Sequence, residues 1–307
     1  MSTGIRNKLS EISESVDETP LQRVLSPPEV LLLPHLVMVV LVFGGAMLVT
    51  VLIAFQPESV GQGTISWTQW TVDNVVNVAT DTFWFEISKD TVWFSALTTV
   101  VCFLVSYPAA YALAMKIGRG KLIFIIALIL PLVTSINIRM FGWVILLIQD
   151  GILSSVVTAT GVVQTMPQLM YKELTVLLGT IYAYLPFMLF PIYISFANLD
   201  DELIEAARDQ GADRLQIFRR IVLPLTKPGI MIGALFTFVL SLGAEVESLM
   251  LGGSQVVTMS MDITYSFQEA QNWQVGSAKV LGMLIISAIA GILILRTVDL
   301  EEIAERR

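Results

Sequence analysis

Charge, cysteine and histidine are all scarce in this chain. Of its 307 residues, 14% are charged and 55% are hydrophobic, whereas a soluble domain carries about 25% charged residues. A single cysteine, Cys102, excludes an internal disulfide and a zinc site built from cysteines. The single histidine, His35, lies near the start of an apolar run, and we interpret it as a packed or interfacial residue. The composition therefore predicts a membrane protein.

Basic charge and catalytic motifs are also lacking. The net charge of -8 excludes the basic surface typical of nucleic-acid binding. The chain has no phosphate-binding G-x-x-x-x-G-K-[ST] motif, so it does not bind ATP in that way. It has no H-E-x-x-H motif, and one histidine offers little for the base that an intramembrane enzyme needs. We therefore expect no catalytic residue and no metal site.

Long apolar runs are abundant instead. They predict an all-α integral membrane protein with six transmembrane helices. A run of 25 residues is roughly 37 Å long as a helix and crosses a hydrocarbon core of ~30 Å. Prolines within the runs indicate a packed bundle, because neighbouring helices must cover the freed carbonyl groups. The expected spans are approximately residues 31–55, 91–115, 122–148, 174–196, 229–251 and 275–295.

The distribution of lysine and arginine predicts the orientation. Fourteen of the 18 lie in residues 1–28, 116–121, 208–227 and 296–307, and only Lys89 and Lys172 lie in the alternate loops. Because positive loops remain on the cytoplasmic side, both termini are expected there. The predicted organisation is a cytoplasmic tail (1–28), a six-helix transmembrane domain (29–297) with a cytoplasmic loop at 198–228, and a second tail (298–307).

The long polar loop carries local signals for two short helices. Its acids at 200–202 suit the N-terminus of a first helix. Gly211 is expected to end that helix in the left-handed conformation. Asp213 and Gln216 have the spacing of a capping box for the second helix. Pro224 and Pro228 are expected to bracket the return to the membrane.

Two apolar faces are expected on these short helices, from residues at helical spacing. The first face would be Leu199, Leu203, Ala206 and Ala207, and the second Leu215, Phe218 and Ile221. A stiff surface loop and a docking element explain these local features about equally well.

A resemblance favours docking. Residues 205–211 read E-A-A-R-D-Q-G, and residues 221–224 read I-V-L-P. They resemble the EAA loop of ABC-importer permeases, E-A-A-x-x-x-G followed after about nine positions by I-x-L-P. In that family the loop forms a coupling helix that fits a cleft in the cytoplasmic ATPase. The resemblance implies that the docking residues are Glu205, Ala206, Ala207, Asp209, Gly211 and Ala212.

Other segments resemble the spermidine/putrescine branch of that family. S-Y-P-A-A-Y-A-L-A at 106–114 is similar to its G-Y-P-x-A-Y-x-L-A. Residues 130–143 resemble its P-x-x-x-S-x-x-x-R-x-x-x-W, and N-W-Q-V-G-S-A at 272–278 resembles its N-W-x-x-G-S-A. The segment G-A-E-V-E-S at 243–248 departs from the branch pattern G-E-F-V-x-P. The implied substrate is a polyamine, with an opine, an amino-acid-like cation or an anion as alternatives.

The resemblance also implies the assembly. The chain resembles the permeases of type I ABC importers. In these importers a second permease subunit, two ABC ATPase subunits and an extracellular substrate-binding protein complete the complex in the cell membrane. This chain would bind no cofactor, because ATP and Mg²⁺ lie on the ATPases. A secondary transporter is the remote alternative, since inverted repeats with broken helices are not evident in the sequence.

Charged residues within spans are candidates for a translocation path, because they are costly there and usually face a protein interior or water. From unbroken helices, Arg139 and Glu245 would lie at similar depths, roughly 26 Å and 24 Å from the inner edge. The candidates for the path are Arg139, Trp143, Tyr184, Glu245 and Glu247. A structural ion pair between Arg139 and Glu245 is the alternative.

Aromatic residues have two interpretations as well. They can form a cage that attracts a cationic amine, or they can anchor helices at the membrane interface. The cage candidates are Trp143, Tyr182, Tyr184, Phe187 and Trp273, whereas interface anchoring is expected for Trp67, Trp70, Trp84 and Trp93. Lys279 is expected to reach the headgroups from the sixth span.

Overall fold

The computed structural model describes residues 28–116, 120–161 and 167–296. All regular elements in these ranges are helical, and six of the helices are long and apolar enough to cross a membrane. This confirms the predicted all-α fold with six spans. The predicted tails, apart from Pro28, lie outside the described residues. The chain divides into two units: the first ends at Ile53 and the second begins at Ala54.

The first unit is a single membrane span. It consists of α3 (Pro28–Val39), the π-helical turn η1 (Val40–Gly44) and α4 (Gly45–Ala54), whose last residue belongs to the second unit. No charged residue occurs between Pro34 and Ala54. A helix that is apolar on all sides is typical of a membrane span.

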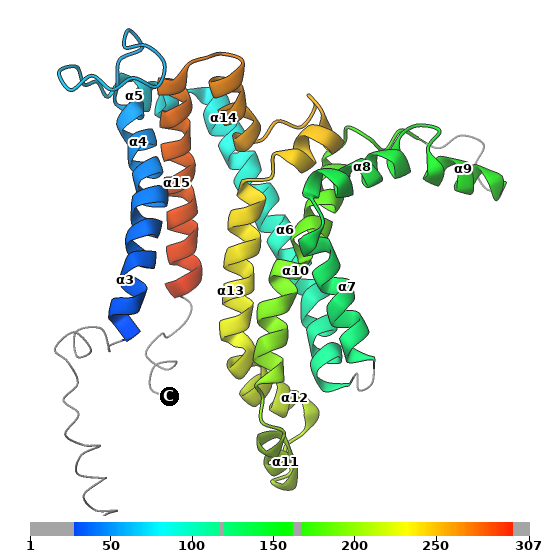
Figure 1. Cartoon of the computed structure of the whole chain (residues 1–307). Helices are drawn as coiled ribbons and strands as arrows, with labels where there is room; N and C mark the ends of the chain where they lie inside the picture. Colours follow the sequence, from blue (N-terminus) through cyan, green and yellow to red (C-terminus); the bar gives the residue numbers. More distant parts are fainter. Residues whose placement is uncertain (1–27, 117–119, 162–166, 297–307) are drawn as a thin grey trace, which may run out of the picture. The chain divides into compact units, whose positions relative to one another are not determined.

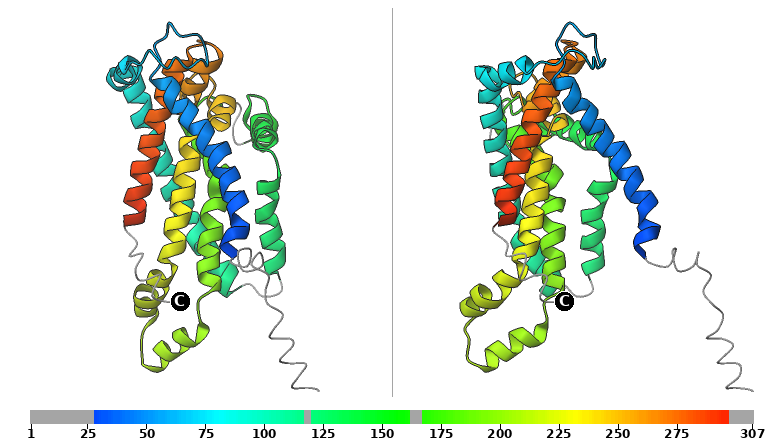
Figure 2. Two further views of the ribbon diagram at one scale, coloured as in Figure 1. Left: turned by 60° about the vertical axis from the view of Figure 1, so that its left-hand side comes forward. Right: turned by 90° about the vertical axis from the view of Figure 1, so that its left-hand side faces the viewer.

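The second unit has three long helices side by side at its centre (Figures 1 and 2). They are α6 (Thr82–Met115), α10 (Glu173–Ala197) and α13 (Leu223–Leu242), and α15 (Trp273–Arg296) packs beside α13. Small residues allow close contact between α10 and α13: a Cβ atom added to Gly233 would lie 2.8 Å from the Met188 carbonyl oxygen.

The loop before α6 is more ordered than the sequence predicted. It contains α5 (Asp73–Thr80), and α6 begins at Thr82 rather than near residue 91. The Asp81 carboxylate caps α6 by accepting a hydrogen bond of 2.9 Å from the Phe83 amide. Residues 56–90, which the sequence left between the first two predicted spans, are therefore largely helical in their second half.

The predicted third span is broken. Instead of one helix over 122–148, the chain forms α7 (Lys121–Val133), α8 (Ile136–Leu147) and α9 (Ile152–Ala159). Pro131 removes one helical amide, and the Thr134 hydroxyl bonds the Leu130 carbonyl at 2.8 Å. Helices α8 and α9 turn away from the bundle (Figure 1). The depth inferred for Arg139 from an unbroken helix is therefore wrong.

The fifth span is shifted towards the polar loop. After α11 (Asp201–Asp209), helical structure continues through α12 (Arg214–Ile217), the π-helical turn η2 (Phe218–Val222) and α13. The span thus covers Arg214–Leu242 rather than residues 229–251. Both Pro224 and Pro228 lie within α13, so they do not bracket a turn. Two further elements, η3 (Ser248–Gly252) and α14 (Met259–Gln268), precede α15.

Candidate functional site: a capped loop and a polar cluster between spans

Helix α11 has both of the predicted caps. At its start, the Asp200 carboxylate accepts a hydrogen bond of 3.0 Å from the Glu202 amide. At its end, the amides of Gly211 and Ala212 donate to the carbonyls of Arg208 (2.9 Å) and Ala207 (3.0 Å). This pair of bonds is a Schellman motif. Gly211 adopts a φ of +79°, which glycine tolerates far better than residues with a Cβ atom.

The next helix begins with the predicted capping box. The Asp213 carboxylate accepts from the Gln216 amide at 2.7 Å, and the Gln216 side chain accepts from the Asp213 amide at 3.2 Å. The two short helices are thus fixed by their own hydrogen bonds. The turn between them, around Gly211, stays in a defined conformation.

The faces of these helices differ from the prediction. Ile204 and Ala207 pack against the core, whereas Leu203 is half exposed and Ala206 is exposed. The buried residues after them are Ile217 and Val222, which are five positions apart. The π-helical turn η2 has a longer period than the α-helix on which the spacing Leu215–Phe218–Ile221 relied.

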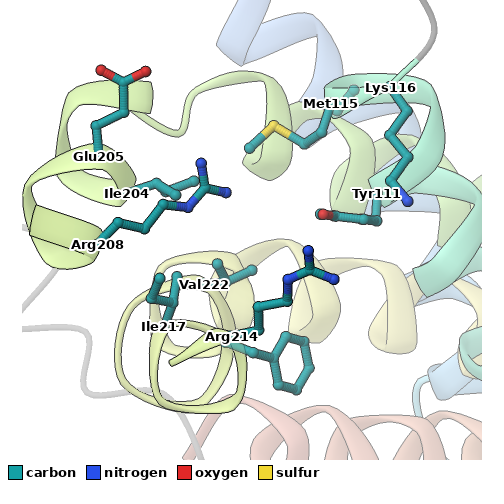
Figure 3. A pocket seen from close by; sticks show the side chains of 11 residues that line it. Tyr111, Met115, Lys116, Ile204, Glu205, Arg208, Arg214, Ile217 and Val222 are labelled. Carbon is teal, nitrogen blue, oxygen red and sulfur yellow. The ribbon is translucent and has the colours of Figure 1, made fainter. Parts of the chain in front are cut away.

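The candidate docking residues therefore lie on one short helix and its cap. Glu205, Ala206, Asp209 and Gly211 are exposed, and Ala207 and Ala212 are half-buried. A cleft of about 750 Å³ separates this loop from the end of α6 (Figure 3). The loop thus presents a preformed surface on one side and a cleft on the other.

A second candidate site joins α8, α10 and the segment before η3. The Arg139 guanidinium carbon lies 5.8 Å from the centre of the Tyr182 ring, and the Trp143 ring is 5.6 Å from the same ring. The Tyr184 hydroxyl donates a hydrogen bond to the Glu247 carboxylate. Arg139 also interacts electrostatically with Tyr184 and Glu247, so four of the five predicted path residues, all except Glu245, belong to one cluster.

Glu247 is the acid of this cluster. Its side chain is 1% exposed, and its Oε1 atom has no hydrogen-bond partner among the described residues. In the sequence, Glu247 falls between the spans Arg214–Leu242 and Trp273–Ile294. Burial raises the pKa of its carboxyl. The Tyr184 hydrogen bond and the charge of Arg139 act in the opposite direction.

Arg139 also has unused hydrogen-bonding groups. Its buried Nε and Nη1 atoms have no partner in the part of the chain that the structure describes. Within the same part, no ion pair joins it to Glu245, which is half-buried. The structure therefore does not support the ion-pair interpretation. An unpaired arginine and an acid with a free oxygen leave groups available to a ligand.

Three aromatic and charged residues differ from their predicted roles. Trp273 packs against Phe267, with ring centres 5.9 Å apart, rather than joining the Trp143 cluster. Trp84 is buried and does not anchor a helix at the interface. Lys279 is 9% exposed and lies 5.6 Å from the Trp84 ring centre, so it does not reach the headgroups.

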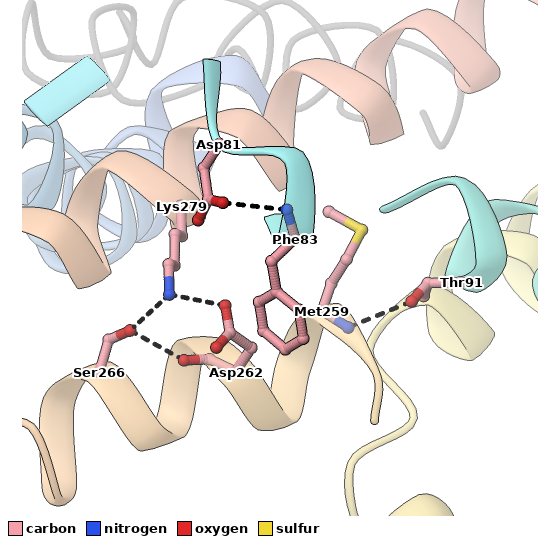
Figure 4. Close-up of polar contacts among 7 residues, drawn as sticks. All are labelled: Asp81, Phe83, Thr91, Met259, Asp262, Ser266 and Lys279. Atoms are coloured by element: carbon pink, nitrogen blue, oxygen red, sulfur yellow. Dashed lines mark hydrogen bonds and ion pairs between the residues drawn. The ribbon is translucent and has the colours of Figure 1, made fainter. Parts of the chain in front are cut away.

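Lys279 is held by α14 (Figure 4). Its Nζ atom lies 2.6 Å from an Asp262 carboxylate oxygen and 3.0 Å from the Ser266 hydroxyl. The sequence-based prediction missed Asp262, because it left this segment outside the predicted spans and expected no helix there. The available signal was the spacing of four between Asp262 and Ser266, which places both on one face of a helix.

Comparison with known proteins assigns the family. Residues 25–300 match the family described as binding-protein-dependent transport system inner membrane component. The chain belongs to this family. It is therefore a membrane permease component, and its homologues are subunits that are not catalytic themselves.

Two relatives are spermidine/putrescine transport system permease proteins named PotB. The protein from Haemophilus influenzae is 31% identical over 219 residues, which cover 71% of this chain and 76% of the relative. The protein from Escherichia coli is 32% identical over 220 residues, which cover 72% and 80%. The resemblance to this branch is confirmed.

The fold matches a solved permease. It is similar to a chain of the bacterial alginate ABC transporter in complex with an alginate pentasaccharide-bound periplasmic protein. The TM-score is 0.70 at 16% identity, and the match covers 87% of this chain and 92% of the other. The six-span architecture is therefore that of an ABC-importer permease.

Proposed function

We propose that this chain is a transmembrane subunit of an ABC importer that takes up a polyamine such as spermidine or putrescine. The observation that carries the proposal is the 31–32% identity with two polyamine permeases over more than two thirds of each chain. The likeness to the alginate transporter supports the fold alone, since its identity is low.

The proposed coupling element is α11 with its Gly211 cap. Glu205, Ala206, Ala207, Asp209, Gly211 and Ala212 would contact a cytoplasmic ATPase. The small side chains permit close approach, and hydrogen bonds cap the helix at both ends. For the ATPase to drive transport, its contacts with this loop must differ between the two states of the permease.

The proposed partners follow from this assignment. A second permease subunit, two ABC ATPases and an extracellular substrate-binding protein would complete the importer, with ATP and Mg²⁺ on the ATPases. Both termini and the loop at 198–228 would be cytoplasmic, as the distribution of lysine and arginine predicts.

The proposed path includes Arg139, Trp143, Tyr184, Glu245 and Glu247. The free oxygen of Glu247 can accept a hydrogen bond from an ammonium group. The rings of Tyr182 and Trp143 attract cations through their faces. A second candidate substrate is an anion, because Arg139 has two buried nitrogen atoms without a partner in the described ranges.

The test is uptake by the whole importer. The permease pair, the ATPases and the cognate binding protein are reconstituted in proteoliposomes with ATP inside. Labelled spermidine, putrescine, an opine, a basic amino acid and sulfate are compared. We expect ATP-dependent uptake of the polyamines. Uptake of only another solute would overturn the polyamine assignment, and uptake without ATP would overturn the importer assignment in favour of a secondary transporter.

A further inference from the structure

The cleft between α11, α12 and the end of α6 is lined by three cations. Lys116 directly follows α6, Arg208 comes from α11 and Arg214 from α12. The two guanidinium groups and the Lys116 amine lie around the opening, whereas the Glu205 carboxylate points away from it (Figure 3). Glu205 also lines the cleft, so three cations and one acid leave the lining with a net positive charge.

These cations have no counter-ion among the described residues. None of the three forms a salt bridge with any other residue in the described ranges. The Lys116 amine lies 5.5 Å from the centre of the Tyr111 ring, a contact that leaves its positive charge uncompensated. Three like charges around one opening repel each other unless an anion lies between them.

Much of the remaining lining is apolar. Ala114, Met115, Ile204, Ile217 and Val222 form part of the wall, and Ile217 and Val222 belong to the buried core cluster. A small hydrated anion gains nothing from such a wall. A molecule with an anionic head and an apolar body matches both parts of the lining.

The cleft also lies beside the ends of two candidate membrane spans. Met115 is the last residue of the span Thr82–Met115, and Arg214 is the first residue of the span Arg214–Leu242. Lys116 and Arg214 thus mark the ends of two membrane-spanning helices. Basic pockets between such helices attract anionic lipid headgroups.

We propose that this cleft binds the phosphate headgroup of an anionic phospholipid, with its glycerol and upper acyl chain against the apolar wall. The lipid would bridge α6 to the loop, because its phosphate contacts Lys116 on one side and Arg208 and Arg214 on the other. The inference concerns a lipid site and does not depend on which solute is transported.

The experiment measures lipid binding to the full chain, purified with its partner permease in a mild detergent. Native mass spectrometry counts bound lipid during titration with phosphatidylglycerol or phosphatidylcholine. The variant R208Q/R214Q removes two lining charges. The variant R219Q/R220Q is the matched control, because it removes two charges from the same loop outside the cleft lining.

We expect the wild-type chain to bind phosphatidylglycerol in preference to phosphatidylcholine. R208Q/R214Q should weaken phosphatidylglycerol binding about tenfold or more, and R219Q/R220Q less than about threefold. Equal binding by all three proteins would overturn the proposal. Competition by glycerol 3-phosphate as strong as that by the lipid would show a soluble-anion site instead. Loss of bound lipid whenever the ATPases are added would assign the cleft to an acidic segment of that partner.

Discussion

The hydroxyl oxygens of Tyr107 and Thr226 lie 3.1 Å apart and join α6 to α13. The Tyr107 ring also packs against Phe196 of α10 and Phe218 of η2, at 5.2 Å and 6.1 Å between ring centres. One side chain therefore contacts two other spans and the helix that leads out of the polar loop. A displacement of the polar loop would therefore be transmitted to α6, α10 and α13 through the contacts of Tyr107.

Tyr107→Phe removes the hydroxyl and keeps the ring. The Thr226 hydroxyl retains its bond of 2.8 Å to the Val222 carbonyl, so no buried donor is left unpaired. We expect a loss of about 0.5–1.5 kcal/mol in the free energy of unfolding. Tyr107→Ala also removes the ring contacts and should cost about 3–5 kcal/mol. Unfolding in detergent measures both, and equal losses would contradict the role of the ring.

Gly211→Ala tests the cap of α11. No atom lies within 4 Å of the added Cβ, so any cost comes from the φ of +79°. We expect a loss of about 1 kcal/mol, faster hydrogen exchange in residues 201–212 and weaker co-purification of the ATPases. Gly211→Asn is the matched variant, because asparagine tolerates this conformation better. If the alanine variant exchanges and co-purifies like the wild type, the cap has no part in docking.

Glu247→Gln tests the polar cluster. It keeps the shape of the side chain and removes the charge that would attract an ammonium group. We expect polyamine uptake to fall at least tenfold while the assembled complex remains intact. Glu269→Gln, an exposed acid outside the cluster, is the control and should transport at least half as well as the wild type. Equal uptake by the two variants would remove Glu247 from the proposed path.

Arg139→Gln and the double variant with Glu247→Gln complete a double-mutant cycle. If Arg139 acts through the charge of Glu247, the two effects on uptake are not additive. Additive effects would place the two side chains at independent steps. Complex yield and thermal unfolding serve as the check on folding for all four proteins.

Lys279→Met tests the buried ion pair with Asp262. The substitution leaves a buried carboxylate without its partner, which costs about 3–5 kcal/mol. The double variant Lys279→Met/Asp262→Leu should regain most of that loss, because no charge is then buried alone. Unfolding of the three proteins in detergent measures the difference. A loss in the single variant below about 1 kcal/mol would contradict a structural role of the pair.

The caps of the loop could be predicted because each depends on residues close in sequence. Asp200, Gly211 and the Asp213–Gln216 pair act within a few positions of themselves. The buried faces of the two short helices could not be predicted. The π-helical turn at Phe218–Val222 changes the number of residues per helical turn, and the residue types do not indicate this change.

The ends of the spans were harder to predict for a different reason. Apolar residues lie on both sides of the break at Thr134 and Ser135, and an apolar run resumes in η3 after Glu245 and Glu247. Hydrophobicity indicates that residues avoid water, but it does not indicate where the chain changes direction. The partner of Lys279 depends on the direction of α14, which no local pattern determines.

The length of helix α6 affects how movement is transmitted across the membrane. Its 34 residues extend over roughly 51 Å without interruption, although the hydrocarbon core is only ~30 Å thick. One end carries Trp84, which packs beside Lys279, and the other carries Tyr111 in the cleft. A continuous helix of this length acts as a lever, although Pro108 removes one of its backbone hydrogen bonds. A tilt of about 10° displaces one end relative to the other by roughly 9 Å, so a small rotation at the cleft becomes a large movement across the membrane.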